Sequence, residues 1–355
     1  MILVVNAGSS SVKIEVFDLA LNSVASSAVS EIGKAARLKL ARQSRPVAAM
    51  DHTDALTHLL DALAVQGIPL SQLVAAAHRI VHGGAELTAP VRLTPDILDK
   101  IADCNSLAPL HNPHNLSGIN ALLRLAPELP QYGSFDTAFH ATNPDVAVTY
   151  AIPQAERDKG IRRYGFHGLS YAGLVDSFRS DLPRRLLALH LGNGASLCAI
   201  LEGRSIATSM GYSPLDGLVM GSRAGSIDGM AVLRLATDHG IDRAAHLLNH
   251  DSGLRALGGT NDMAQLLAAD TTDARFAVEH FCYWAARQAG SAVVTMGGLD
   301  AIAFTGGIGE NAESVRNRIV SHLACFGPVP VHVVPAEEER QIARDALALM
   351  GQKPA

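Results

Sequence analysis

The sequence has few cysteines, and none lie in a pattern that binds zinc or builds a disulfide framework. Its 355 residues include four cysteines, Cys104, Cys198, Cys282 and Cys325, and no two are spaced as Cys-x-x-Cys. Each stands in an apolar stretch. We therefore interpret them as small buried side chains of a protein in a reducing compartment, which predicts a cytoplasmic location.

Charged residues and long apolar runs are also scarce. Only 18% of the residues are charged, the net charge is −5, and no block of lysine and arginine occurs, which argues against a nucleic-acid partner. No apolar segment approaches the length that spans a bilayer. The first apolar run ends after four residues at Asn6, which predicts a strand rather than an export signal. Neither a nucleic acid nor a membrane is expected as a partner.

What the chain does have is the composition of an α/β protein. Hydrophobic residues make up 48% of it, and helix-forming segments alternate with β-rich runs. The length allows two domains, each with a substantial core.

The first stretch of the chain predicts a hairpin with a small polar turn. An apolar run over residues 2–5 is followed by small residues at 6–11 and by alternating apolar residues from Val12 to Phe17. Amide groups, hydroxyls and Lys13 at such a turn suit phosphate oxygens. An ordinary serine-rich hairpin is the alternative reading.

A second copy of this design favours the phosphate reading. Residues 185–201 repeat an apolar run, a glycine-rich turn at 192–196 and another apolar run. Internal similarity of this kind indicates two related halves. Two phosphate-sized turns that face each other across a cleft are what a nucleotide-dependent phosphotransferase requires.

Single polar residues stand out in four further stretches. Arg79 lies between apolar residues and a Gly-Gly pair, and burying it is costly without an anionic partner, although a structural ion pair is the alternative. Asp136 follows a predicted strand and could be a helix cap, and His167 could be a structural histidine. Arg223 lies in the glycine-rich stretch 210–228, which indicates close backbone approach or a tight loop.

The apolar spacing and the breakers predict the main elements. Helices are expected over 51–66, 95–107, 116–125, 231–248, 273–296 and 337–350, with Trp284 in the core. Strands are expected over 19–50, 73–81, 300–304 and 331–334. Loops are expected over 108–115 and 252–263, and a glycine turn at 305–311 precedes a further helix.

Taken together, these stretches resemble the acetate kinase family, within the superfamily of actin-like, sugar-kinase-like and Hsp70-like ATPases. Eight motifs occur in the family's order, which makes the resemblance specific over nearly the whole chain. They are NAGSSSVK (6–13), HRIVHGG (78–84), APLHNP (108–113), FDTAFH (135–140), RRYGFHG (162–168), HLGNGAS (190–196), SPLDGLVMGSR (213–223) and FTGGIGEN (304–311).

The resemblance implies an α/β fold of two duplicated ribonuclease H-like (actin-like ATPase) domains with an interdomain cleft. The first domain would span residues 1–140 and be joined by the C-terminal helix 335–355. The second, 141–334, would carry the nucleotide site and the dimer interface, because members are usually homodimers.

The implied activity is that of an acetate kinase. Such an enzyme transfers the γ-phosphoryl group of ATP reversibly to acetate, with Mg²⁺ (Mn²⁺ is an alternative), and gives acetyl phosphate and ADP. A propionate or other short-chain carboxylate kinase and a pyrophosphate-dependent acetate kinase are the alternatives. A non-catalytic or chaperone-like nucleotide-binding protein of the same fold is the rival from another class.

The resemblance also implies a role for each matching residue. The catalytic group would be Arg79, Asp136, His167 and Arg223. The carboxylate substrate would contact Arg79, Val81, Leu110, Phe166 and Pro214. The metal would be held by Asn6 and Glu310. The nucleotide and its phosphates would contact Ser9, Ser11, Lys13, His190, Gly192, Asn193, Gly194, Asp262, Gly306, Gly307, Ile308, Gly309 and Asn311.

Two departures from the family pattern bear on the substrates. Ser226 stands where the family usually has Asp, and Met263 and Ala264 replace an aromatic residue and an arginine near the adenine. These changes remove a stacking surface and a cation, so the phosphoryl donor is left open between ATP, another nucleotide and pyrophosphate. Val81 is a medium-sized wall that favours acetate over propionate, since one methylene is worth about 1–3 kcal/mol in such a pocket.

Overall fold

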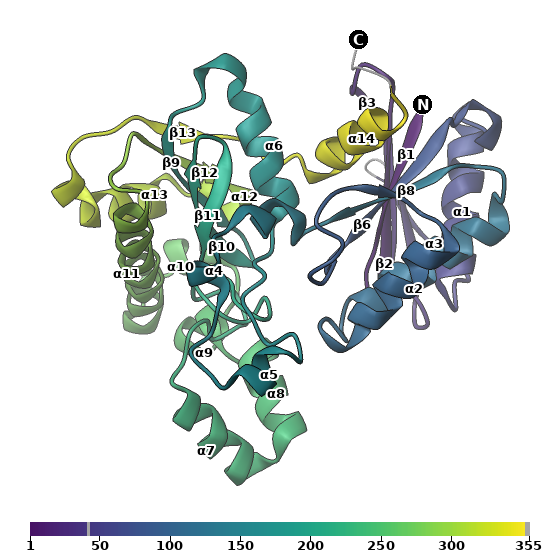
Figure 1. Ribbon diagram of the computed structural model, residues 1–355. Coiled ribbons are helices and arrows are strands. Elements are labelled where there is room, and N and C mark those ends of the chain that lie inside the picture. The colour runs from purple at the N-terminus through teal and green to yellow at the C-terminus, as the bar shows by residue number, and fades with distance from the viewer. Residues whose placement is uncertain (41–42, 352–355) are drawn as a thin grey trace. The chain divides into compact units, whose positions relative to one another are not determined.

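The computed structural model describes residues 1–40 and 43–351 (Figure 1). The chain divides into two compact units, and each is described by itself. The first unit comprises residues 1–138 and 337–355, and the second comprises residues 139–336. No helix of the described residues has the length and apolar character needed to cross a membrane.

The first unit is built on an eight-stranded mixed sheet of order β5-β4-β3-β2-β1-β6-β8-β7. The strand β1 pairs antiparallel with β2 and parallel with β6, and β6 pairs parallel with β8. The strands are β1 (Ile2–Ala7), β2 (Ser11–Phe17), β3 (Ser23–Ser30), β4 (Arg37–Leu40), β5 (Gln43–Pro46), β6 (Ala75–Ile80), β7 (Val91–Arg92) and β8 (Gln131–Phe135).

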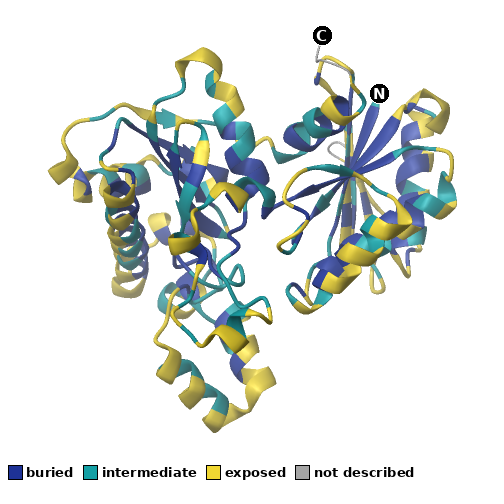
Figure 2. Cartoon of the chain, in the orientation of Figure 1, coloured by how far each residue is buried: buried dark blue, intermediate teal, exposed yellow. Residues whose placement is uncertain are grey.

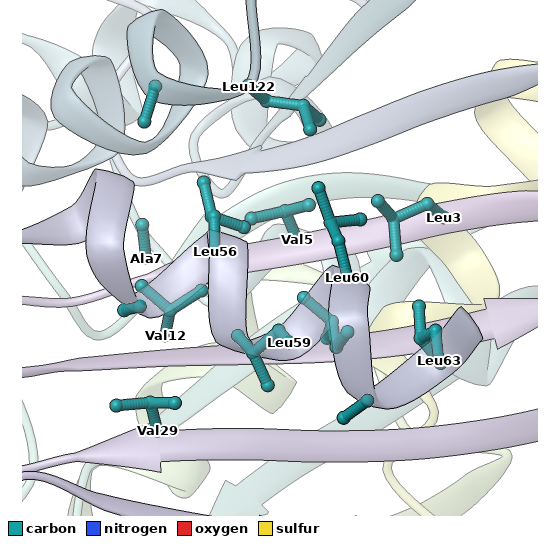
Figure 3. Close-up of a cluster of buried hydrophobic side chains, with 14 of the residues drawn as sticks. Leu3, Val5, Ala7, Val12, Val29, Leu56, Leu59, Leu60, Leu63 and Leu122 are labelled. Carbon is teal, nitrogen blue, oxygen red and sulfur yellow. The ribbon is translucent and has the colours of Figure 1, made fainter. Parts of the chain in front are cut away.

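Helices cover both faces of this sheet. On one face α1 (His52–Val65) and α3 (Asn112–Leu125) pack, with α2 (Pro95–Asp103) beside α3. Figure 3 shows how leucines of α1 meet alternate residues of β1, β2 and β3, such as Val5, Val12 and Val29. This alternation places the intervening residues on the opposite face. There α14 (Glu338–Leu349) contacts β1, β2, β6 and β8.

The register of the strands places three polar residues on the face that α14 covers. Asn6 is paired with Lys13 across the β1–β2 ladder, so their side chains share a face. Val5 is paired with His78 in the parallel β1–β6 ladder, so the next residues, Asn6 and Arg79, also lie side by side. The row Arg79, Asn6, Lys13 therefore crosses the sheet under α14.

The second unit contains a five-stranded sheet of order β11-β10-β9-β12-β13. Two antiparallel pairings on one side of β9 and two parallel pairings on the other repeat the pattern around β1. The strands are β9 (Arg185–Leu191), β10 (Ala195–Leu201), β11 (Arg204–Thr208), β12 (Ala301–Thr305) and β13 (Val331–Val333). The internal duplication predicted from the two turns is thus confirmed in the sheet topology.

Helix α6 (Gly168–Phe178) packs through Tyr171 and Leu174 on alternate residues of β9, β10 and β12, and α11 (Thr272–Thr295) contacts β9, β10 and β11. The other helices are α4 (Asp145–Val148), α5 (Gln154–Arg157), α7 (Gly229–His239), α8 (Ile241–His250), α9 (Gly253–Gly258), α10 (Met263–Ala268), α12 (Gly306–Asn311) and α13 (Glu313–His322). Short 3₁₀ turns are η1 (Leu70–Gln72), η2 (Cys104–Ser106), η3 (Ala138–Thr142), η4 (Arg179–Asp181) and η5 (Ala324–Phe326).

Most predicted elements are confirmed, and four expectations were wrong. The single helix expected over 231–248 is two helices, α7 and α8, which are separated at Gly240 with its φ of +81°. Helix α3 begins at Asn112 within the expected loop, because Pro113 suits the first turn of a helix. A short helix, α9, occupies part of the expected loop 252–263. The expected glycine turn at 305–311 is short, because helix α12 already begins at Gly306, where a φ of +79° allows the chain to change direction.

The predicted burial of two side chains, Trp284 and Cys325, was wrong. Trp284 is only half-buried, and the guanidinium of Arg287 lies 4.5 Å from the centroid of its ring. Helix α11 turns its alanines inward, among them Ala285 and Ala289, together with Phe281, and this leaves Phe276 and Tyr283 on the outer face. Cys325 is exposed, whereas the other three cysteines are buried as expected.

Candidate functional site

The first phosphate-like turn joins β1 to β2 and is held from below by α1. The amide of Gly8 donates to the carbonyl of Ser11 over 2.8 Å, and His52 Nε2 donates to the carbonyl of Gly8 over 2.8 Å. Ser9 and Ser11 are exposed at this turn. Lys13 Nζ lies 2.6 Å from Glu339 Oε1, and its side chain is 49% exposed, so the ammonium stays within reach of solvent.

Arg79 forms an ion pair, as the alternative reading of its motif anticipated. Its Nη2 lies 2.7 Å from Asp136 Oδ2 and its Nε donates to Asp136 Oδ1 over 3.1 Å, which is a two-pronged contact. Its Nη1 lies 3.7 Å from Glu338 Oε2. Burial lowers the pKa of the Arg79 guanidinium, and the carboxylates of Asp136 and Glu338 raise it by more, so it stays charged. Burial also raises the pKa of the Asp136 carboxyl, and Arg79 opposes that shift.

Two glutamates that contact Arg79 and Lys13 were not predicted from the sequence. Glu338 and Glu339 begin helix α14 and lie against Arg79 and Lys13, more than 200 positions away in the chain. The only signal was an acidic run at the start of a predicted helix. Such a run is normally explained by the positive end of the helix dipole, so it did not indicate a site.

Two buried asparagines of α3 hold the segment after β6 in place. Asn115 accepts from the amide of Val81 over 3.1 Å and donates to the carbonyl of Ala7 over 2.8 Å, which ties the ends of β6 and β1 together. Asn112 accepts from the amide of His82 over 3.1 Å and donates to its carbonyl over 2.9 Å. These contacts explain why helix α3 begins at Asn112, inside the expected loop 108–115, whose residues 108–111 do form a turn.

In the second unit, His167 is held in an unusual backbone conformation. It is the N-cap residue of α6, with a φ of +59°, a left-handed conformation that costs a non-glycine residue of order 1–3 kcal/mol. Its Nδ1 lies 2.9 Å from Ser196 Oγ, and its ring stacks on His190 with 4.3 Å between centroids. The Nε2 side of the ring lies toward Gly194, where an added Cβ would be 3.3 Å away.

Arg223 lies beside the same turn and is partly buried with neutral acceptors. Its Nη1 donates to the carbonyl of Pro214 over 3.2 Å and lies 3.8 Å from Met220 Sδ. Over residues 1–40 and 43–351 the structure gives it no ion pair with an aspartate or glutamate, and burial lowers the pKa of its guanidinium. A buried cation of this kind is costly unless an anion binds there.

A pocket of about 570 Å³ opens next to this turn, between the β9–β10 turn, α10 and α12. It brings together six of the residues predicted to contact the nucleotide: Gly192, Asn193, Asp262, Gly307, Ile308 and Asn311. Met263, Ala264 and Leu267 add apolar wall, and Thr260, Asn261 and Gln265 add polar groups. The pocket has the size and the mixed lining of a small-molecule site.

Three of the predicted ligands are engaged in local contacts. The Asp262 carboxylate caps helix α10 by accepting from the amides of Ala264 and Gln265. Asn311 Nδ2 donates to the carbonyl of Gly307 over 2.8 Å. Glu310 Oε1 accepts from the amide of Ala336 over 3.0 Å, so its carboxylate fixes the segment that leads to α14.

The predicted substrate pocket is divided between the units. Val81 and Leu110 belong to the first unit, where Leu110 is 57% exposed. Phe166 and Pro214 belong to the second, where Phe166 is 1% exposed and its carbonyl accepts from His140 Nε2. The wall that these four residues would form around a methyl group stays a prediction.

The oxygen donors of the first unit suit a magnesium ion. Mg²⁺ prefers hard oxygen ligands, keeps several waters, and is usually bound through one or two carboxylates together with substrate phosphates. Asn6, Asp136 and Glu338 supply such oxygens on or beside the row under α14. No group of three or more His, Cys, Asp or Glu side chains in the described part of the chain could hold a metal alone. A magnesium ion here would need further oxygen ligands, such as those of substrate phosphates.

This geometry is shared with a known group of enzymes. Residues 1–344 match the model of the acetokinase family. The chain belongs to the acetokinase family. An acetate kinase of Methylocella silvestris is 38% identical over 400 residues, which cover 100% of this chain and 99% of that protein. An acetate kinase of Rhodopseudomonas palustris is 40% identical over 347 residues, which cover 92% of this chain and 87% of that protein.

Solved structures agree with this assignment of the acetokinase family. The crystal structure of Porphyromonas gingivalis acetate kinase matches with a TM-score of 0.92 and 32% identity over 98% of this chain and 99% of that one. A propionate kinase of Francisella tularensis matches with a TM-score of 0.92 and 35% identity over 97% and 98%. The duplicated actin-like ATPase fold, the carboxyl-accepting phosphotransferase class and the acetate kinase function predicted from the sequence are confirmed.

Proposed function

We propose that this acetokinase catalyses the reversible, Mg²⁺-dependent transfer of the γ-phosphoryl group of ATP to acetate, giving acetyl phosphate and ADP. The observation that carries the proposal is the partly buried guanidinium of Arg223, to which the described residues offer only neutral acceptors, beside His167 and Gly194. The pocket of about 570 Å³ begins at the same turn, at Gly192 and Asn193. A nucleotide base in that pocket would direct its phosphates along the turn toward Arg223 and His167.

The reaction needs charge neutralisation more than acid–base chemistry. Acetate is already an anion, so its oxygen attacks the γ-phosphorus directly; the new O–P bond forms as the bond to the β-phosphate oxygen breaks and ADP leaves. Bringing two anions together in line is the main barrier. Arg223 would offset the charge, and His167 would donate to a phosphoryl oxygen. A bound magnesium ion would neutralise the donor phosphates.

In the first unit, we assign Arg79 and Lys13 to the substrate and the phosphate path, with Asn6, Asp136 and Glu338 as the metal-side oxygen donors. Support comes from the row that these residues form under α14 and from the exposure of Lys13. Glu310 was predicted as a metal ligand, and its contact with the amide of Ala336 supports a structural role beside any such function.

The pocket lining favours a nucleotide as the donor. Met263, Leu267 and Ile308 present apolar surface of the kind on which a purine packs, and pyrophosphate would leave this surface uncovered. Acetate remains the proposed acceptor. The similarity to a propionate kinase keeps propionate as a second candidate.

The proposal is tested by trapping the acyl phosphate as its hydroxamate. Purified enzyme with Mg²⁺ is given each donor, ATP or pyrophosphate, with each acceptor, acetate or propionate. We expect product with ATP and acetate, a preference for acetate over propionate of about 10–200-fold, and no product with pyrophosphate. Product with pyrophosphate alone would contradict the assignment of the donor, and no product with any pair would contradict the function.

We also propose a homodimer formed through the second unit. Helix α7 has no buried residue. Helices α7 and α8 carry exposed apolar side chains: Met230 is 71% exposed, Leu233 59% and Ile241 77%. Figure 2 shows α7 and α8 as largely exposed ribbons. The test is the mass in solution: we expect a dimer that Leu233→Asp converts to monomer, and a monomeric wild type would contradict the proposal.

The cytoplasm, which supplies ATP and keeps thiols reduced, is the proposed location. The free state of Cys104, Cys198, Cys282 and Cys325 supports it.

A further inference from the structure

His167 is held through two hydroxyl groups in sequence. Its Nδ1 lies 2.9 Å from Ser196 Oγ, and the phenol oxygen of Tyr171 lies 2.6 Å from the same Ser196 Oγ. The two hydroxyl-bearing side chains are each 0% exposed. Tyr171 comes from α6, the helix that His167 caps, and Ser196 comes from β10.

The acidity of the two hydroxyls sets that direction. A phenol, with a pKa near 10, is a stronger donor than an aliphatic alcohol, and the alcohol oxygen is the stronger acceptor. Tyr171 therefore donates to Ser196. The hydrogen of Ser196 is then directed to His167 Nδ1, which must accept it. An imidazole that accepts at Nδ1 carries its proton at Nε2.

The Nε2 atom is the one that faces the turn of the second unit. A Cβ added at Gly194 would lie 3.3 Å from His167 Nε2 and 3.9 Å from Arg223 Nη1. A proton at Nε2 therefore points to the region where the guanidinium of Arg223 lies. The opposite order of hydrogen bonds would present a lone pair there, which repels an anion.

We propose that Tyr171 and Ser196 are positioning residues that lock His167 as the Nε2–H tautomer, so that it donates to a phosphoryl oxygen. The identity of that acceptor rests on the proposed function, whereas the tautomer does not. In the order Tyr171, Ser196, His167, the hydroxyl of Tyr171 reaches the imidazole of His167 through Ser196.

The direct test reads the tautomer by long-range ¹H–¹⁵N NMR of the histidine side chains. The His167 signals are assigned by their loss in His167→Gln. We expect the wild type to show a protonated Nε2 and a bare Nδ1. Tyr171→Phe should give a mixture, and Ser196→Ala should lose the preference. A wild type protonated at Nδ1, or an unchanged tautomer in Ser196→Ala, would overturn the proposal.

Kinetics supply the second readout. Partners that orient an imidazole are commonly worth about 10–100-fold in activity. We expect Tyr171→Phe to lower kcat by about tenfold with the KM for acetate little changed, and Ser196→Ala to lower it at least as much. Adding Tyr171→Phe to Ser196→Ala should have no further effect. Independent, multiplying losses in the double variant would contradict the sequential arrangement.

A matched variant controls for the loss of a buried phenol. Tyr164 is also buried, at 8% exposure, and its hydroxyl donates to the carbonyl of Gly160 over 2.9 Å. Tyr164→Phe should leave the His167 tautomer unchanged, and a tautomer shift in it would contradict the specificity of the relay. A wild type with the expected tautomer but no transfer to acetate would support the relay and refute the proposed function.

Discussion

At the scale of single residues, Arg223 and Arg79 show two ways to keep a cation inside a protein. Arg79 is neutralised by Asp136 and approached by Glu338, whereas the described part of the chain gives the partly buried Arg223 neutral acceptors only. A buried charge that lacks a partner costs several kcal/mol. The uncompensated charge of Arg223 is therefore unfavourable in the free protein, and the binding of a phosphoryl group or a carboxylate would offset that cost.

This difference predicts what Arg223→Ala does to activity and to stability. Loss of one preorganised donor to the transferring group lowers kcat by about 10²–10³-fold. The free energy of unfolding should stay the same or rise, because an uncompensated buried cation is removed. Acetyl hydroxamate formation and urea unfolding of the same preparation measure both effects.

Arg184→Ala is the matched control, since Arg184 is 72% exposed and pairs with Glu202 at the surface. We expect it to leave both turnover and stability within error. Near-normal turnover of Arg223→Ala would remove Arg223 from the proposed mechanism, and a large loss of stability would show that its role is structural.

At the scale of elements, helix α3 is the part of the first unit that fixes the end of β6. Asn115 is 4% exposed and satisfies one amide and one carbonyl of two different strands. A buried backbone group left without its partner costs about 1–3 kcal/mol.

Asn115→Ala should therefore lower the free energy of unfolding by about 2–4 kcal/mol, since two buried groups lose their partner. Chemical denaturation measures this directly. Asn317→Ala on the exposed side of α13 serves as the comparison, with an expected change within about 0.5 kcal/mol. Equal effects of the two substitutions would contradict the role given to Asn115.

Some helices and strands were predictable from the sequence, and the start of α3 was not. Hydrophobic alternation predicted β1, β2, β9 and β10, and leucine spacing predicted α1, because local periodicity carries these signals. The start of α3 was wrong, because Asn112 and Pro113 are turn residues by preference and become a helix start only through contacts with His82.

The site was predictable where a motif carried it. Gly192 and Asn193 of the β9–β10 turn line the pocket, and the contact with a nucleotide that their motif predicts stays a prediction. Glu338 and Glu339 were missed because their partners, Arg79 and Lys13, are distant in the chain and only the sheet register and α14 bring them together. The placement of Trp284 was also wrong, since which face of a helix is buried depends on tertiary packing.

At the scale of the whole molecule, buried histidines make stability depend on pH. Burial lowers the pKa of His78, His82 and His140 from 6.5 to about 4 in each case. Between pH 6.5 and 4 the unfolded chain binds more protons than the folded one, so stability falls as the pH falls. Each histidine should cost about 2 kcal/mol by pH 5.

Urea unfolding at pH 7 and pH 5 measures this loss. His78→Gln should reduce the difference between the two pH values, because one of the three groups no longer titrates. His246→Gln, at a site that is 52% exposed, is the comparison for the loss of a histidine at the surface. Equal stability of the wild type at both pH values would contradict the assignment of buried neutral histidines.

The duplicated architecture gives each unit the same order of antiparallel and parallel pairings around a central strand, and a turn after that strand. The chemistry proposed for the chain is phosphoryl transfer to a small carboxylate. One measurement tests that claim most directly: ³¹P NMR of the purified enzyme with ATP, Mg²⁺ and acetate. We predict that the signal of the γ-phosphate declines as those of acetyl phosphate and ADP appear, and that adding excess ADP reverses the change. Unchanged ATP, or inorganic phosphate formed with no acetyl phosphate, would contradict the account.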